Sequence, residues 1–160
     1  MATSSDPVAR FADVAERYVA WVEGPRVEQA EDVRRGFALV LELLRAAIEL
    51  PDVDPAGPGV ERLTHEGWQR VHQSFGWLPV QYYWDAEPLV DGPQELMTGD
   101  LCDDLADIWR DLKPALELYR AGHVDCACWH WKFDFERHWG EHAANAVPIL
   151  MSTMAPWGPA

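Results

Sequence analysis

Two histidines and three aspartates are spaced so that, on helices, their side chains can meet at one polar site. His138 and His142 are four residues apart, which places both imidazoles on one face of a helix. Asp104, Asp107 and Asp111 follow an i, i+3, i+7 spacing and form a single acidic ridge. Two imidazoles one turn apart can bind one divalent ion, and carboxylates of a facing helix complete its coordination. The sequence therefore predicts a divalent metal site at His138, His142, Asp104 and Asp107.

The same side chains also fit a buried polar network that contains no metal. Imidazoles can pair with carboxylates inside a bundle, and such a network fixes which helix faces meet. The polar cluster that we predict consists of Asp104, Asp107, Asp111, Lys132, His138 and His142. The sequence leaves the metal site and the polar network open as alternatives.

The segment from His138 to His142 also matches the H-x-x-E-H pattern of inverted zinc peptidases. On a helix, Glu141 projects off the face that carries the two histidines, so this match is weak support for a peptidase. The sequence has no glycine-rich phosphate loop, no G-x-S-x-G elbow and no dinucleotide fingerprint. A metal-dependent, hydrolase-like reaction is therefore the enzymatic hypothesis that the motifs favour.

Both histidines belong to a tryptophan-rich stretch, residues 129–142. We predict that this stretch lies within one long helix from Val124 to Leu150. At about 100° per residue, one face of this helix should be buried. That face comprises Val124, Cys128, Trp131, Phe135, His138, Trp139, His142, Ala146 and Ile149. Trp129 and Phe133 point the opposite way, which makes them candidates for an interface with another protein or a second copy.

Further helices are predicted before this stretch, because capping residues precede periodic apolar runs. They begin at Asp6-Pro7, near Val27, at Thr64 and at Asp100, and Ala121-Gly122 ends the last of them. Residues 76–99 lack a helical period and form an irregular, aromatic-rich insertion in which a short extended pair is one alternative. We therefore predict a single all-α domain over residues 1–160. It is an antiparallel bundle of four to five helices with residues 151–160 as a frayed tail.

Composition limits the partners of the protein. A formal net charge of −14 argues against nucleic acid and against an anionic membrane surface, both of which need clustered Lys and Arg. No apolar run approaches the length of roughly 18 residues that a membrane span needs. The 3 cysteines form neither a disulfide framework nor a zinc ribbon. We expect a cytoplasmic protein with reduced thiols.

Three functions fit these features. The first is a non-enzymatic binding or adaptor module that presents Trp129 and Phe133, or its acidic surface, to another protein. That partner is a basic protein or a second copy of the chain. The second is a metal-dependent enzyme, with Asp104, Asp107 or Asp111 as ligand or base beside the two histidines. The third is an acidic antagonist, such as an immunity protein that shields a basic partner.

Three segments of the chain resemble a known family. They read DDLADIWRDLK at 103–113, ELYRAG at 117–122 and WHWKFDFERHWGEH at 129–142. They resemble the bacterial domain-of-unknown-function family five-zero-six-three, whose pattern reads DDLADIYRDLK, LYR-x-G and WxWKFxFExHWGxH. Trp109 stands where tyrosine is common in that family. The resemblance implies a small, mostly helical cytoplasmic protein and brings no established activity.

Overall fold

Helices dominate the structure, and most of them start where the sequence supplies a cap. The computed structural model describes residues 6–85 and 96–154. The Asp6 carboxylate accepts a hydrogen bond from the amide of Val8, and Thr64 and Asp100 cap later helices in the same way. The helices are α1 (Pro7–Glu23), α2 (Gln29–Ile48), α3 (His65–Ser74), α4 (Leu101–Arg120), α5 (Val124–Asp134), the π-helical turn η1 (Phe135–Trp139) and α6 (Gly140–Met154).

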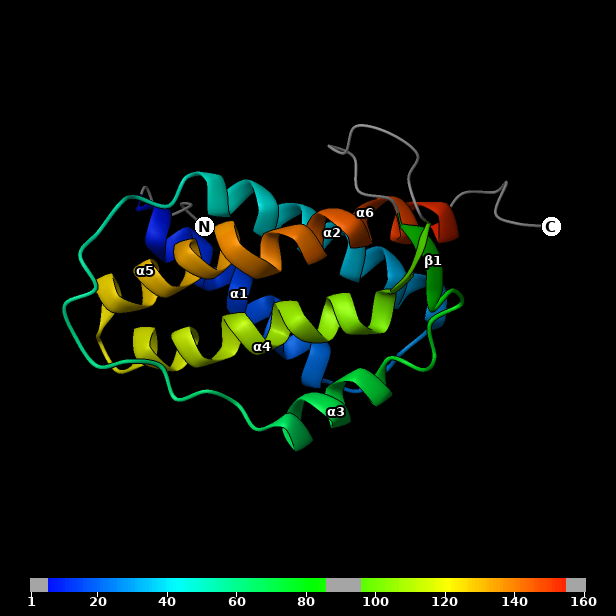
Figure 1. Ribbon diagram of the computed structural model, residues 1–160, viewed down its shortest axis with the longest axis horizontal. Helices are drawn as coiled ribbons and strands as arrows, with labels where there is room; N and C mark the ends of the chain where they lie inside the picture. The colour runs from blue at the N-terminus through cyan, green and yellow to red at the C-terminus, as the bar shows by residue number, and fades with distance from the viewer. Residues whose placement is uncertain (1–5, 86–95, 155–160) are drawn as a thin grey trace.

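The long helices lie along one another in an all-α bundle, as the sequence predicts. Figure 1 shows α4 beside the rod made of α5, η1 and α6, with α1 and α2 behind them. The left-handed Gly122 (φ 90°) ends α4, and the chain turns back into α5 so that the two helices run antiparallel. α3 packs on the outer side of α4 after a long connection around one end of the bundle (Figure 1). The helical framework therefore places the aspartates of α4 opposite the C-terminal rod.

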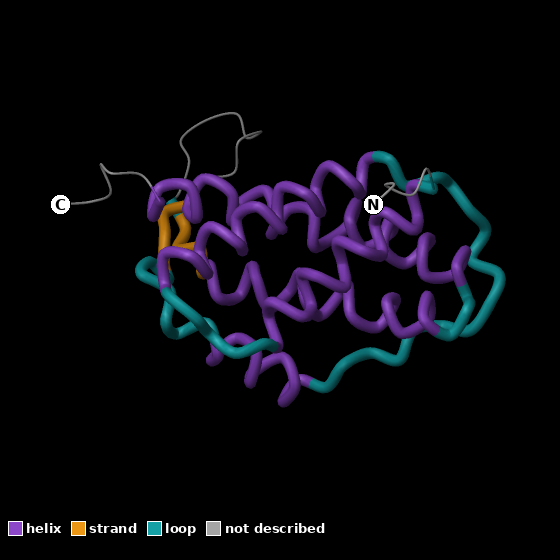
Figure 2. The backbone as a smooth tube through the Cα atoms, turned by 180° about the vertical axis from the view of Figure 1, so that it is seen from behind, coloured by secondary structure: helices purple, strands orange, loops and turns teal. Residues whose placement is uncertain are grey.

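The aromatic insertion contains a short hairpin at one end of the bundle (Figure 2). Strands β1 (Tyr82–Asp85) and β2 (Met97–Asp100) pair antiparallel, with Tyr83 opposite Gly99. A Cβ atom at Gly99 would lie 2.2 Å from the Tyr83 ring, so only glycine lets this ring cross to α4. Residues 86–95 of the insertion lie outside the described residues.

The C-terminal rod is helical from Val124 to Met154, but it is not one uninterrupted α-helix. The π-turn at Phe135–Trp139 inserts one extra residue, so the buried face shifts beyond this point, although Trp139 and Ala146 are fully buried as predicted. Ala143 and Leu150 are fully buried, whereas the predicted His142 and Ile149 are half-buried. Val124, predicted to be buried, is 39% exposed at the first position of α5.

The π-turn places the two histidines at the edge of the core instead of inside it. Trp131 and Trp139 are fully buried and pack against Phe11, with ring centroids 4.9 and 6.0 Å from that ring. The extra residue between them turns His138 and His142 towards α4. A Cβ atom at Gly140 would lie 2.3 Å from the Phe135 carbonyl oxygen, so the turn depends on a glycine here.

The end of the rod differs from the frayed tail that the sequence suggests. Residues 151–154 continue α6, and residues 155–160 lie outside the described residues. No helix within the described ranges is both long and apolar enough to cross a bilayer.

Candidate metal centre

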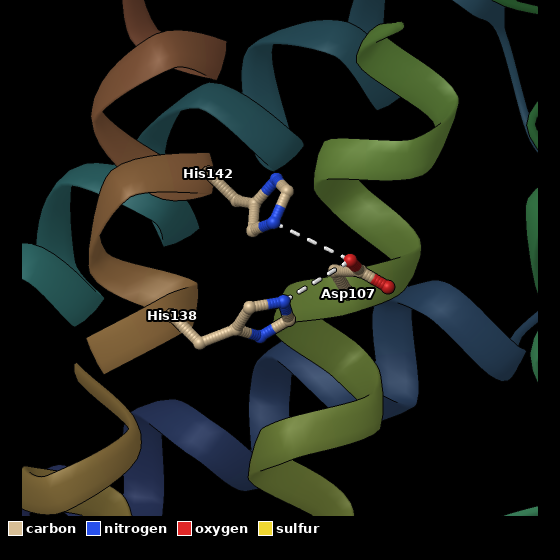
Figure 3. A group of neighbouring side chains, drawn as sticks. All are labelled: Asp107, His138 and His142. Carbon is tan, nitrogen blue, oxygen red and sulfur yellow. Dashed lines mark ion pairs between the residues drawn. The ribbon is translucent and has the colours of Figure 1, made fainter.

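His138, His142 and Asp107 converge across the contact between α4 and the C-terminal rod. Both histidine Nε2 atoms face the same carboxylate oxygen, Oδ2 of Asp107, at 3.5 Å from His138 and 3.3 Å from His142 (Figure 3). The two rings lie edge to face with their centroids 4.8 Å apart. The ligand atoms of these three residues all lie within 4.8 Å of one another. We call this group the His-Asp triad.

The other nitrogen of each imidazole is held by its own aspartate. Nδ1 of His138 lies 2.6 Å from Asp111 Oδ2, and Nδ1 of His142 lies 2.7 Å from Asp104 Oδ1. An ionised carboxylate can only accept a hydrogen bond, so each Nδ1 carries the hydrogen. In the neutral form of each ring, the Nε2 lone pair is therefore directed at the centre of the triad.

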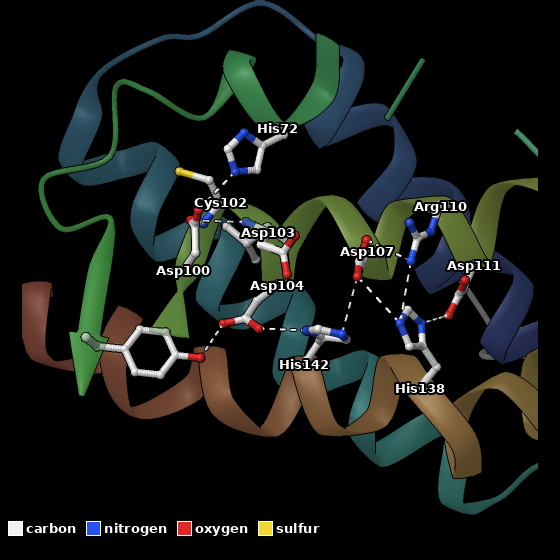
Figure 4. A network of polar contacts seen from close by, with 12 residues as sticks. His72, Asp100, Cys102, Asp103, Asp104, Asp107, Arg110, Asp111, His138 and His142 are labelled. Atoms are coloured by element: carbon white, nitrogen blue, oxygen red, sulfur yellow. Dashed lines mark hydrogen bonds and ion pairs between the residues drawn. The ribbon is translucent and has the colours of Figure 1, made fainter. Parts of the chain in front are cut away.

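Three side chains that sequence reasoning missed fix the carboxylates in place. The Trp68 indole donates to Asp107 Oδ1 at 2.6 Å, and the Arg110 guanidinium pairs with the same oxygen at 3.0 Å. The Tyr83 hydroxyl donates to Asp104 Oδ2 at 2.7 Å. The other carboxylate oxygen of Asp104 contacts His142 (Figure 4). These contacts leave Asp107 Oδ2 facing the histidines. The aromatic insertion thus supplies a hydroxyl to the site instead of merely closing the end of the bundle.

Two sequence-based assignments need correction. Lys132 does not join the polar cluster, because its ammonium group bonds the Leu50 carbonyl oxygen at 3.2 Å and Asp52 at 2.6 Å on another side of α5. Asp104, predicted as a direct metal ligand, instead holds the far side of the His142 ring. The ligand set that the geometry brings together is His138, His142 and Asp107.

The spacing and charge of the triad suit one divalent ion. A tetrahedral ion with bonds of roughly 2.0–2.1 Å separates its ligand atoms by about 3.3–3.4 Å. The two Nε2–Oδ2 distances, 3.3 and 3.5 Å, match that separation. Three carboxylates stand against one guanidinium, so two negative charges remain in excess when both imidazoles are neutral. One divalent cation, or two protons on the imidazoles, neutralises that excess.

The surrounding carboxylates favour protonated imidazoles in the metal-free protein. The hydrogen bond to Asp111 raises the pKa of His138 above its ordinary value against the effect of burial. Burial lowers the pKa of His142, but the hydrogen bond and charge of Asp104, with the charge of Asp107, outweigh burial and raise it. A raised folded-state pKa means that these groups stabilise the fold below about pH 6.5 and lose that effect as pH rises through the folded value.

The metal-free protein should therefore become less stable as the pH rises above about 6.5. Urea denaturation at several pH values, with a chelator present, measures this dependence. His142→Gln should flatten the curve, because it removes one of the two titrating imidazoles. A free energy of unfolding that rises with pH in the parent protein would contradict the assigned directions.

Glu141 and the three cysteines, which the sequence analysis considered, do not belong to the His-Asp triad. Glu141, the acid of the H-x-x-E-H match, is exposed. The three cysteines are free and buried. Burial raises the pKa of the Cys102 thiol to about 12 and that of Cys128 to about 11. The Cys102 and Cys128 thiols are therefore not thiolates near neutral pH and are poor nucleophiles.

Comparison with known proteins places the chain in a family. No curated protein matches it. A solved structure, protein BF1032 from Bacteroides fragilis, is similar with a TM-score of 0.79 and 19% sequence identity over 98% of this chain and 97% of that one. This likeness shows a shared fold. A model of a domain of unknown function matches residues 3–155. The chain therefore belongs to the family DUF5063, as the three sequence segments suggested.

Proposed function

We propose that this protein binds one divalent transition-metal ion, with zinc as the first candidate, through the His-Asp triad. A single arrangement carries the proposal. Two Nε2 atoms lie 3.3 and 3.5 Å from one carboxylate oxygen, while a separate aspartate holds each Nδ1. Histidines that ligate metals usually donate their other N–H to a carboxylate in this manner.

The triad fits a metal better than it fits a network held by protons alone. Charge-assisted N–H···O bonds are typically about 2.7–2.9 Å long, and the outer His–Asp contacts, at 2.6 and 2.7 Å, are that short. The inner contacts to Asp107, at 3.3 and 3.5 Å, are too long for strong bonds of this kind. An ion between the three ligand atoms accounts for short outer contacts and long inner ones together.

The proposed ion would be accessible to small molecules. The side chains of His138 and His142 are 38% and 22% exposed, so the centre reaches solvent. Three protein ligands leave at least one coordination position for water or a substrate, as in catalytic zinc sites. An ion in such a site lowers the pKa of bound water, so metal-assisted hydrolysis is the reaction class that the centre supports.

A calorimetric titration tests the proposal. Protein purified without a metal-affinity tag and stripped with chelator is titrated with zinc, and separately with magnesium. We expect one zinc ion per chain and a raised melting temperature, with much weaker binding of magnesium, which prefers oxygen ligands. Absence of saturable zinc binding, or equal binding of both ions, would refute the triad as a transition-metal site.

A second proposal, a protein-binding role, is supported by a pair of aromatic rings on α5. Trp129 and Phe133 stack with centroids 4.8 Å apart, and Phe133 is 42% exposed. Arg137 lies over the Phe133 ring at 5.7 Å. Aromatic rings and arginine are enriched where interfaces gain their binding energy. The net charge of −14 favours a basic partner, and a second copy of the chain is the other candidate.

Replacing both rings tests this second role. If the chain self-associates through them, Trp129→Ala/Phe133→Ala should elute later than the parent in sizing chromatography. Ile48→Ala is the matched control, because Ile48 is an apolar side chain that is 76% exposed on α2. Equal elution of parent and double variant argues against self-association, and salt-sensitive capture of basic proteins then tests the other partner class.

A further inference from the structure

A cavity of about 390 Å³ lies directly beside the His-Asp triad. It is enclosed by residues 60–65, α3, α4 and α5. Three of its lining side chains touch the triad. Trp68 donates to Asp107, Asp111 holds His138, and the Arg110 guanidinium lies 3.5 Å from His138 Nε2. None of the three triad residues lines the cavity itself, so these side chains would stand between a molecule in the cavity and the proposed ion.

The lining of the cavity also carries groups suited to an anion. Arg62 is exposed and takes part in none of the salt bridges found among the described residues. The Thr64 hydroxyl oxygen accepts from the Gly67 amide, which leaves the hydroxyl hydrogen to donate. One nitrogen of the Arg110 guanidinium pairs with Asp107, and the other N–H groups of the guanidinium can donate to an anion.

Asp134 is a half-buried carboxyl in the same lining, four residues before His138. Burial and the nearby charge of Asp111 raise its pKa to about 6, so about half of the carboxyl is protonated at pH 6 and about a tenth at pH 7. Only the protonated carboxyl donates a hydrogen bond, so Asp134 is compatible with a bound anion at mildly acidic pH. Half-buried acids with perturbed pKa values in a cleft are typical of functional sites.

A larger cavity nearby does not adjoin the His-Asp triad. It measures about 720 Å³ and shares Arg62 and Thr64 with the smaller one. Its remaining charged groups include Lys113 and Glu23, which pair with each other. None of the side chains that contact the His-Asp triad lines it. The smaller cavity is therefore the one positioned to hold a molecule beside the ion.

We propose that the 390 Å³ cavity binds a small molecule through its phosphate or carboxylate group, held by Arg62, Arg110 and Thr64 beside the metal centre, with Arg110 contacting both the anion and the His-Asp triad. Arginine offers paired N–H donors that match the oxygens of both groups. The inference rests on the proposed metal centre, because Arg110 joins the anion site to the His-Asp triad, and it makes a small oxyanion the ligand class of the cavity beside that centre.

Calorimetry of the zinc-loaded protein with inorganic phosphate, and separately with acetate, tests the inference. At least one of the two anions should bind saturably, and which one binds tells the phosphate class from the carboxylate class. Arg62→Gln should weaken that binding about tenfold or more, since a hydrogen bond to a charged group contributes roughly 1.5–3 kcal/mol. Arg35→Gln, at an exposed position on α2 that lines neither cavity, should leave it unchanged.

A zinc titration of the same variants separates the two proposals. Arg62→Gln should bind zinc as the parent does, because Arg62 does not touch the triad. Normal zinc binding without any binding of phosphate or acetate, or equal anion affinity of the Arg62 and Arg35 variants, overturns the anion site alone. Failure of the parent to bind zinc overturns both the metal centre and the anion site that depends on it.

Discussion

Replacing either histidine of the triad with glutamine is expected to lower the affinity for zinc at least about a hundredfold. His138→Gln and His142→Gln each remove one of three protein ligands, and outer-sphere changes alone typically cost roughly 10–100-fold. Each variant also leaves one aspartate, Asp111 or Asp104, without its imidazole partner. Calorimetric titration of stripped protein measures the affinity, and circular dichroism establishes that each variant is folded.

His72→Gln is the matched control for these variants. His72 also pairs with an aspartate, Asp100, at 3.0 Å, but it lies outside the triad. Its removal should leave zinc affinity unchanged. If His72→Gln weakened zinc binding as much as His142→Gln does, or if both triad variants kept the parent affinity, the assigned ligands would be incorrect.

Gly140→Ala is expected to destabilise the protein and to impair metal binding at the same time. The added methyl group would lie 2.3 Å from the Phe135 carbonyl oxygen and 2.8 Å from the Phe135 ring, so the π-turn has to rearrange. Overpacking of this kind costs about 1–3 kcal/mol. At about 2–4 °C per kcal/mol for a chain of this size, the melting temperature should fall by several degrees.

The loss of metal binding distinguishes the π-turn from ordinary packing. If the turn reverts to α-helical spacing, His138 and His142 rotate away from Asp107 and zinc affinity falls together with stability. Gly59→Ala is the control, since nothing lies within 4 Å of a Cβ atom at that position. A Gly140→Ala protein with the parent's melting temperature and zinc affinity would show that the turn does not set the geometry of the centre.

Much of the framework can be predicted from local signals in the sequence. Asp6, Thr64 and Asp100 each cap a helix at the predicted position, because a cap acts through amides only two or three residues away. The aspartate ridge on α4 follows from helical spacing alone, and Asp104 and Asp107 are buried at the edge of its apolar stripe. The antiparallel turn at Gly122 brings the ridge beside the rod that carries His138 and His142, whereas the orientation of the two rings depends on the π-turn.

The remaining parts of the site depend on tertiary packing. An α-helical period cannot reveal the one-residue insertion of the π-turn, which brings both Trp131 and Trp139 against Phe11. Trp68 reaches Asp107 across 39 residues and Tyr83 reaches Asp104 across 21, and both contacts are long-range. Tyr83 also comes from a segment without a helical period. Lys132 was wrongly included in the predicted cluster because the sequence does not give the direction of its side chain. The ammonium group points away from the acidic ridge, towards Leu50 and Asp52.

The presence of an ion at the triad is tested most directly by anomalous diffraction from crystals of zinc-loaded protein at the zinc absorption edge. The proposed centre predicts one peak about 2.0–2.2 Å from Nε2 of His138, Nε2 of His142 and a carboxylate oxygen of Asp107. Asp104 and Asp111 should remain on the Nδ1 atoms behind the histidines. A map without a peak at this position, or with zinc bound by other side chains, would contradict the account.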